Sequence, residues 1–133
     1  MGKLPFLFFS AKNKMNHNQK VGQFGEGLAR DYLVRHGYKI IGENIKVSYK
    51  EIDIIAKKQN LIVFIEVKTR TSDKFGFADE AISSRKIKHL KRAIGAYLKS
   101  HNSGFQDIRL DLIAIDIDKD KKIAKIKHYK DIF

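Results

Sequence analysis

The sequence predicts an α/β domain in which a central mixed β-sheet is flanked by helices. Two segments carry apolar residues at helical spacing, and short runs of β-branched and aromatic residues lie between and after them. Their order along the chain is one helix, three strands, a second helix and two strands. Because such an order alternates helices with strands, it favours a mixed sheet with helices packed on it.

The first half of the chain predicts one helix and three strands. From Val21 apolar residues recur every three or four positions until Gly37, a residue type typical of a helix C-terminus. A short strand at residues 38–41 follows. Residues 51–57 and 61–68 are two β-type runs joined by three polar residues, which predicts a hairpin of adjacent antiparallel strands.

The second half predicts a helix from Ile82 to Tyr97, which the polar loop 100–104 ends. Two strands follow at residues 108–117 and 122–129, joined by a charged turn. We expect residues 1–19 to be a poorly ordered apolar extension and residues 20–133 to form a single domain, which suits a chain of this length.

The composition narrows the class of protein. The 133 residues include 27 Lys and Arg against 15 Asp and Glu, a formal net charge of +12, while 43% are hydrophobic. A folded, strongly basic domain predicts a polyanionic partner. The chain has no cysteine, which excludes disulfide scaffolds and thiolate sites. With no apolar run near the ~20 residues that span a bilayer and no complete signal peptide, we expect a soluble, cytoplasmic protein with no membrane partner.

Charged residues on the predicted hairpin are the strongest chemical signal. Strand alternation places Glu51 and Asp53 on one face of the first strand, with Ile52 and Ile54 on the other. On the second strand it places Glu66 and Lys68 on one face. The second strand is apolar on both faces, so we expect it to be central and buried, where an unpaired charge is costly. If the hairpin brings Asp53 beside Glu66, two carboxylates converge next to one lysine, and such oxygen ligands suit Mg²⁺ or Mn²⁺.

This constellation predicts phosphodiester cleavage. A metal held by Asp53 and Glu66 would lower the pKa of a bound water, while Lys68 would orient that water or stabilise charge developing on phosphorus. The alternative is a cross-strand salt bridge in which Lys68 neutralises one of the two acids, because structural ion pairs also gather charges.

At Asp53, Glu66 and Lys68 the sequence resembles the PD-(D/E)XK nuclease superfamily, whose signature is an Asp on one strand of a hairpin and a Glu/Asp-x-Lys on the next. Over about residues 20–117 it resembles, more specifically, the YraN-like family of small bacterial proteins. The motifs that carry this resemblance are GEGLA at 25–29, EIDII at 51–55, VFIEVKTR at 63–70, FG at 75–76 and EA at 80–81. Lys50 departs from the family, which usually has glycine there, and the apolar extension lies outside the family pattern.

The resemblance implies a restriction-endonuclease-like αβββαβ core and an endonuclease akin to Holliday-junction resolvases. It also implies that Glu26 projects from the first helix towards the metal, as a further catalytic and metal-binding acid. Glu26 lies at the edge of the apolar helix face, and the alternative is an exposed first-turn acid that pairs with Arg30. Glu51 is either an acid that supports the metal ligands or a solvated one.

The second helix concentrates positive charge, because residues 81–106 contain no acid. Lys86 and His89 lie on the flank of this helix nearest the sheet, and Arg70 follows the predicted site at the end of its strand. With Arg85, these residues are the candidate nucleic-acid contacts. The alternative for each is an ordinary solvated surface position. The basic residues of this helix are Arg85, Lys86, Lys88, Lys91, Arg92 and Lys99.

The leading hypothesis is a Mg²⁺- or Mn²⁺-dependent nuclease that hydrolyses DNA phosphodiester bonds, on branched or damaged DNA in repair or recombination. The alternatives are a non-catalytic nucleic-acid-binding module that retains the fold, and a basic protein that binds RNA or an acidic partner. Motifs for base recognition are not evident, so phosphate contacts should dominate and binding should weaken as salt rises. Paired cleavage of a symmetric junction would need a homodimer.

Overall fold

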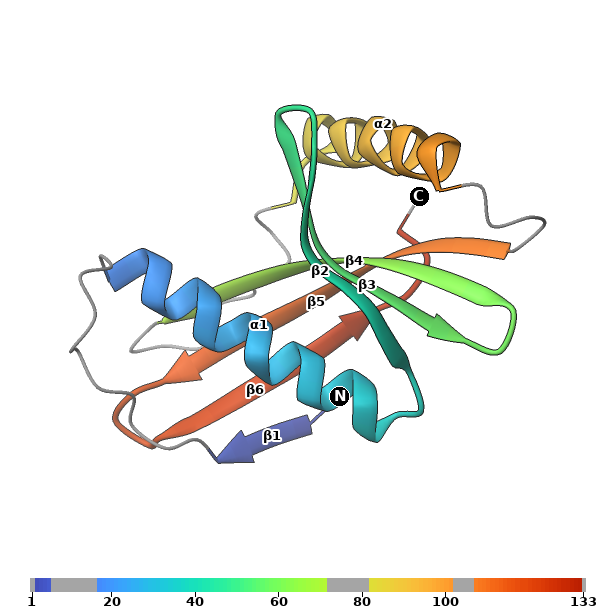
Figure 1. Ribbon diagram of the computed structural model, residues 1–133. Coiled ribbons are helices and arrows are strands. Elements are labelled where there is room, and N and C mark those ends of the chain that lie inside the picture. The colour runs from blue at the N-terminus through green and yellow to red at the C-terminus, as the bar shows by residue number, and fades with distance from the viewer. Residues whose placement is uncertain (1, 6–16, 72–81, 102–106, 133) are drawn as a thin grey trace.

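In the computed structural model, residues 2–5, 17–71, 82–101 and 107–132 are described. In these ranges six strands form one sheet in the order β1-β6-β5-β4-β3-β2, with α1 on one face and α2 on the other (Figure 1). Neighbouring strands are antiparallel except β4 and β5, which run parallel as a crossover through α2 requires. The elements are β1 (Gly2–Pro5), α1 (His17–Arg35), β2 (Lys39–Val47), β3 (Lys50–Lys58), β4 (Leu61–Thr71), α2 (Ser84–Ser100), β5 (Asp107–Asp118) and β6 (Ile123–Tyr129).

The predicted fold class is confirmed: an α/β domain with the order α1-β2-β3-β4-α2-β5, extended by β6 at the β5 edge. The expectation of a poorly ordered N-terminal extension stays a prediction. Gly2–Pro5 form β1, which pairs with β6, and α1 begins at His17. The division of the chain into an extension and a domain at residue 20 stays a prediction. Neither of the two described helices is long and apolar enough to cross a membrane.

Helix α1 packs on the sheet through a stripe of buried residues spaced four apart, Val21, Gly25, Ala29 and Leu33. Gly25 is needed for close packing, because a Cβ atom there would overlap the Thr69 side chain on β4. The absence of a side chain at this position therefore lets the helix backbone approach the strand. The approach brings the middle of α1 over the C-terminal end of β4.

The end of α1 confirms the stop predicted at Gly37. Gly37 has a φ of 84°, which favours glycine, and its N–H donates to the Val34 carbonyl at 3.1 Å. The Tyr38 N–H donates to the Leu33 carbonyl at 3.0 Å. These two bonds satisfy carbonyls that the helix end leaves without a partner, in the pattern of a Schellman motif.

The β3–β4 pairing stops midway along both strands. The ladder runs from Lys58 opposite Leu61 to Ile54 opposite Ile65, whereas β4 continues beside β5 as far as Thr71. Strand β3 stays paired with β2, and both bend away from the sheet towards α2 (Figure 1). Strands β3 and β4 therefore separate at Asp53 and Glu66, and we call this point the fork.

The bend changes the faces that alternation predicts for β3. Ile52 and Ile54 are predicted to share a face, but Ile54 packs in the cluster under α1 and Ile52 in the cluster under α2. That prediction is wrong because strict alternation assumes a strand that stays in the plane of its sheet.

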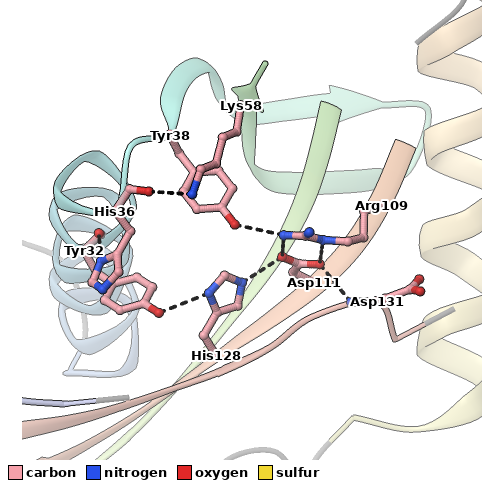
Figure 2. A network of polar contacts seen from close by, with 8 residues as sticks. All are labelled: Tyr32, His36, Tyr38, Lys58, Arg109, Asp111, His128 and Asp131. Carbon is pink, nitrogen blue, oxygen red and sulfur yellow. Dashed lines mark hydrogen bonds and ion pairs between the residues drawn. The ribbon is translucent and has the colours of Figure 1, made fainter. Parts of the chain in front are cut away.

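A buried polar network fastens the opposite end of the α1 face (Figure 2). Asp111 is fully buried and accepts two hydrogen bonds from the Arg109 guanidinium, both at 2.8 Å. His128 Nε2 lies 2.7 Å from the same carboxylate, and the Asp131 N–H donates to it at 3.0 Å. His128 Nδ1 in turn lies 3.2 Å from the Tyr32 hydroxyl. The network thereby joins α1, β5, β6 and the C-terminal residues.

The network sets the charge state of Asp111. Burial opposes ionisation, but hydrogen bonds from His128 and Arg109 outweigh it and hold the pKa of Asp111 below its usual range. A carboxyl group whose pKa is lower in the folded protein stabilises the fold above its unfolded pKa, and this contribution is lost as acid protonates it.

We predict that Asp111→Asn lowers the free energy of unfolding at pH 7 by about 3 kcal/mol, because the Arg109 charge loses its buried partner. Urea denaturation of this variant and of Asp107→Asn, an exposed site at the start of the same strand, measures the difference. The gap in stability between wild type and Asp111→Asn should narrow as the pH falls below about 4, because the carboxyl group then takes up a proton in the unfolded chain while its lowered pKa keeps it ionised in the folded protein. Equal stability of the three proteins at pH 7 would contradict this account.

Candidate metal and phosphate site

Asp53 lies where β3 leaves β4. The last paired residues are Ile54 and Ile65, and one step beyond them the Val67 N–H donates to Asp53 Oδ2 at 2.9 Å. A side-chain carboxylate thus accepts a hydrogen bond from β4 at the point where the backbone of β3 has turned away. This bond fixes the carboxylate at the fork.

Glu66 lies beside Asp53 on the other branch of the fork. Its side chain is 12% exposed, and its Oε1 lies 3.6 Å from the Lys86 ammonium at the start of α2. The Asp53 and Glu66 side chains are close enough to form a hydrogen bond when they share a proton. Without that proton, the buried Glu66 Oε2 has no hydrogen-bond partner in the described part of the chain. Burial of a lone carboxylate oxygen is costly unless a proton or a cation occupies the space beside it.

Two further acids complete the cluster. One carboxylate oxygen from each of Glu26, Glu51 and Asp53 lies within 4.8 Å of the others. With its amide nitrogen facing the acids, Asn44 donates to Glu51 Oε1 at 3.0 Å and to Glu26 Oε2 at 3.1 Å. We call Glu26, Glu51, Asp53 and Glu66 the acidic cluster.

The structure distinguishes between the two positions considered for Glu26. Because α1 begins at His17, Glu26 lies in the middle of the helix and not in its first turn. Arg30, its predicted alternative partner, instead lies 3.2 Å from Glu43 and 3.8 Å from Asp31. Glu26 therefore faces the fork, beside a cleft of about 440 Å³ that α1, Asn44 and Glu51 line.

The acidic cluster holds excess negative charge. Burial, followed by the charges of Asp53 and Glu51, raises the pKa of Glu26 from its ordinary 4.5 to about 7. Burial and the neighbouring Asp53 raise the pKa of Glu66 to about 7, despite Lys86, and burial raises the pKa of Asp53 as well. Each shift has the sign that crowded, partly desolvated carboxylates produce. A divalent cation would offset the same repulsion.

The lysine beside the cluster is not the one expected. Lys68 is predicted to be buried next to the two acids, but it is exposed, and in the described residues the ion pair of Glu66 is with Lys86. The prediction of a buried Lys68 is wrong because β3 has left β4 before this point, so only β5 flanks that part of the strand.

The Lys86 position has a local cause. Ser83 caps α2, and its hydroxyl accepts a hydrogen bond from the Lys86 N–H at 3.1 Å. The cap fixes Lys86 as the third residue of the helix, where it reaches Glu66. Ser83, directly before the helical run, is the signal that points to a helix start here, but it does not reveal which acid Lys86 meets.

The other predicted nucleic-acid contacts lie around the fork. Arg85 and Lys86 are exposed in the first turn of α2, and His89 follows on the same helix, partly exposed. Desolvation and the charges of Lys50, Arg85, Arg92 and Lys86 lower the pKa of His89. Arg70 lines a cleft of about 280 Å³ with Val21, Gly22, Thr69 and Thr71. The motifs at residues 75–76 and 80–81 lie outside the described residues.

We predict that Glu26→Gln raises the melting temperature at pH 8 in EDTA by about 4 °C, because it removes about 1 kcal/mol of repulsion within the acidic cluster. A carboxyl group whose pKa is raised on folding destabilises the fold progressively as the pH rises from about 4.5 to 7. The gain should therefore disappear near pH 4.5. Differential scanning calorimetry checks this, with Asp31→Asn as an exposed control on the same helix; equal gains in both variants at pH 8 would contradict it.

Comparisons with known proteins agree with the sequence motifs. Residues 25–115 match the model of the uncharacterised protein family UPF0102. A UPF0102 protein of Caldicellulosiruptor bescii is 42% identical over 116 residues, covering 86% of this chain and 98% of the relative. One from Syntrophomonas wolfei is also 42% identical, covering 87% and 99%.

Among solved structures, the chain is similar to a repair endonuclease from Pyrococcus abyssi, with a TM-score of 0.44 and 15% identity over 78% of this chain and 40% of that one. The family match spans both branches of the fork and the part of α1 from Gly25 onward, which includes Glu26. The chain belongs to the uncharacterised protein family UPF0102, as its resemblance to the YraN-like family implies.

Proposed function

We propose that this protein is a cytoplasmic, divalent-metal-dependent nuclease that hydrolyses DNA phosphodiester bonds. The convergence of four carboxyl groups from α1, β3 and β4 beside one lysine carries this proposal. In a structural ion pair the positive and negative charges are equal in number. Here four acids are contacted by one lysine ammonium, that of Lys86, among the described residues. Acids crowded in this way are typical of a site that takes a cation.

The residues fit Mg²⁺ or Mn²⁺. All the donors are carboxylate oxygens, which such hard cations prefer, and the buried Glu66 Oε2 has no hydrogen-bond partner among the described residues. Asp53, Glu66 and Glu26 would hold the ion, and Glu51, which has a carboxylate oxygen within 4.8 Å of oxygens of Glu26 and Asp53, is a fourth candidate ligand. When bound, such an ion neutralises charge on the scissile phosphate and lowers the pKa of the attacking water.

Protein groups would hold the phosphate next to this cluster. The first turn of α2 contains no acid and carries Arg85 and Lys86, although acids are favoured at a helix N-terminus. The helix N-terminus and these two cations together favour an anion, and the ion pair with Glu66 keeps Lys86 at the edge of the acidic cluster.

Two lysines are candidates for stabilising charge on phosphorus or orienting the water. Lys68 occupies the position that the nuclease signature requires and is exposed at the rim of the fork, while Lys86 contacts Glu66. The contact with Glu66 makes Lys86 the cation nearer to the acidic cluster. Lys68 remains our proposal for the catalytic lysine, since its long, exposed side chain lies two residues after Glu66 on β4 and can turn towards a bound phosphate.

DNA is the polyanion that we propose as the substrate. Helix α2 carries six basic residues and no acid, so the backbone would be held on a basic surface beside the acidic cluster. A site of this kind reads phosphate positions and shape, which suits branched or damaged DNA in repair or recombination.

We predict that purified protein cleaves DNA with Mn²⁺ or Mg²⁺ and not with EDTA, and that Asp53→Asn lowers the cleavage rate by about 100-fold or more. Labelled linear duplex, single-stranded and four-way-junction DNA, resolved on denaturing gels, measures the rates. Asp31→Asn is the matched control for removal of one acid outside the cluster. Equal cleavage by wild type and Asp53→Asn would identify a contaminating nuclease, and tight binding without cleavage would favour the non-catalytic binding module.

We predict that Lys68→Ala and Lys86→Ala differ in the step they affect. Lys68→Ala should lower the rate of cleavage of bound DNA by about 100-fold or more, whereas Lys86→Ala should mainly weaken DNA binding. Single-turnover rates at saturating protein, with fluorescence anisotropy for affinity, separate the two effects. Lys88→Ala, an exposed lysine on the same helix, controls for loss of one charge; a slow single-turnover rate in Lys86→Ala alone would assign the catalytic role to Lys86.

A further inference from the structure

The tip of the β2–β3 hairpin exposes an aromatic side chain almost completely. Tyr49 is 98% exposed, whereas the next most exposed large apolar residue in the described chain, Val34, is 56% exposed. Val47 pairs with Lys50, so Ser48 and Tyr49 form the turn, and the φ of 55° at Ser48 makes it tight. A tight turn on paired strands holds the ring out from the body of the protein.

The hairpin tip and α2 together form a groove. Its volume is about 220 Å³, and its lining combines the Tyr49 ring with the cations Lys50 and Arg92 and with His89. In Figure 1 the hairpin rises beside α2, away from the rest of the sheet. The groove therefore presents a flat aromatic surface next to positive charge, which are the two elements that bind single-stranded nucleic acid.

This groove lies near the acidic cluster along both of the elements that line it. On α2, Lys86 contacts Glu66 and lies one turn before His89, which faces the groove. Along the chain, Tyr49 and Lys50 directly precede Glu51, and Asp53 lies four residues after Tyr49. Four residues of extended chain span at most about 13 Å, which equals the rise of about four base pairs along the axis of B-form DNA.

We propose that Tyr49 is a stacking platform for an unpaired base, and that this hairpin gives the protein a preference for DNA with a single-stranded segment next to the cleavage site. The inference rests on the proposed function, whose substrate it narrows. The base stacks on the ring, while Lys50 and Arg92 hold the flanking phosphates. In continuous duplex the bases are stacked on one another, so the ring would find no free base face.

Binding measured in EDTA tests the platform without any cleavage. The probes are a plain duplex and the same duplex with a single-stranded tail, each labelled for fluorescence anisotropy. Tyr49→Ala should weaken binding of the tailed DNA by about tenfold, with little change for the plain duplex, and Tyr49→Phe should restore the wild-type preference because it keeps the ring. Tyr49→Leu, which keeps an apolar side chain without the ring, should behave as Tyr49→Ala.

A spectroscopic readout locates the stacked base. With 2-aminopurine placed at successive positions of the tail, fluorescence should be quenched at one position by the wild type and Tyr49→Phe, and not by Tyr49→Ala. Quenching should lie within about four nucleotides of the bond that wild type cleaves with Mn²⁺. Arg92→Gln should weaken the binding of both DNAs and reduce the salt dependence of binding by about one counterion. Lys99→Gln, at the far end of α2, is the control.

The outcomes separate this inference from the proposed function. Equal losses on both DNAs in Tyr49→Ala, or quenching that persists in it, would overturn the platform. So would conversion of a dimer to a monomer by Tyr49→Ala in sedimentation, which would assign the ring to self-association. If the protein binds the tailed DNA selectively through Tyr49 but does not cleave DNA with Mn²⁺, the stacking platform is supported and the proposed nuclease activity is refuted. If wild type cleaves DNA but Tyr49→Ala does not change the binding of tailed DNA, only the stacking platform is refuted.

Discussion

The hydrogen bond from the Val67 N–H to the Asp53 carboxylate is the interaction on which the site depends. Strands β3 and β4 separate at this point, and a separating ladder leaves backbone donors that need new partners. A carboxylate fills that need and becomes fixed between the two branches. The same separation lets Glu26 reach Asp53 from α1 and lets Lys86 reach Glu66 from α2, on opposite sides of the sheet.

Two polar centres on this fold have opposite charge balance. The Asp111 carboxylate contacts the Arg109 guanidinium, the His128 ring and the Asp131 N–H, and the pKa of Asp111 is lowered. At the fork, acids face acids, and the pKa values of Glu26 and Glu66 are raised to about 7. The first arrangement stabilises the fold, whereas the second destabilises it until a proton or a cation arrives. This contrast supports a structural role for the network around Asp111 and a binding role for the acidic cluster.

Much of the fold was predictable because its signals are local. The spacing of Val21, Phe24, Leu28 and Tyr32 predicts α1, Gly37 predicts its end, and the β-type runs predict the β3–β4 hairpin. The nearness of Asp53 and Glu66 follows from hairpin pairing. The exposure of Lys68 and the separation of Ile52 from Ile54 were not predictable in this way, because both depend on where β3 bends out of the sheet.

The sequence by itself determined the order of the elements, the stop of α1 at Gly37 and the residues that carry charge, since these depend on neighbours within a few positions along the chain. Only the tertiary structure decided which charges meet. Lys86 and Glu66 are 20 residues apart, and Glu26 and Asp53 are 27 apart, so no local pattern pairs them. Their contacts arise because α1 packs closely on β4 at Gly25 and because β3 and β4 separate at Asp53 and Glu66. The separation lets α1 approach Asp53 and α2 approach Glu66.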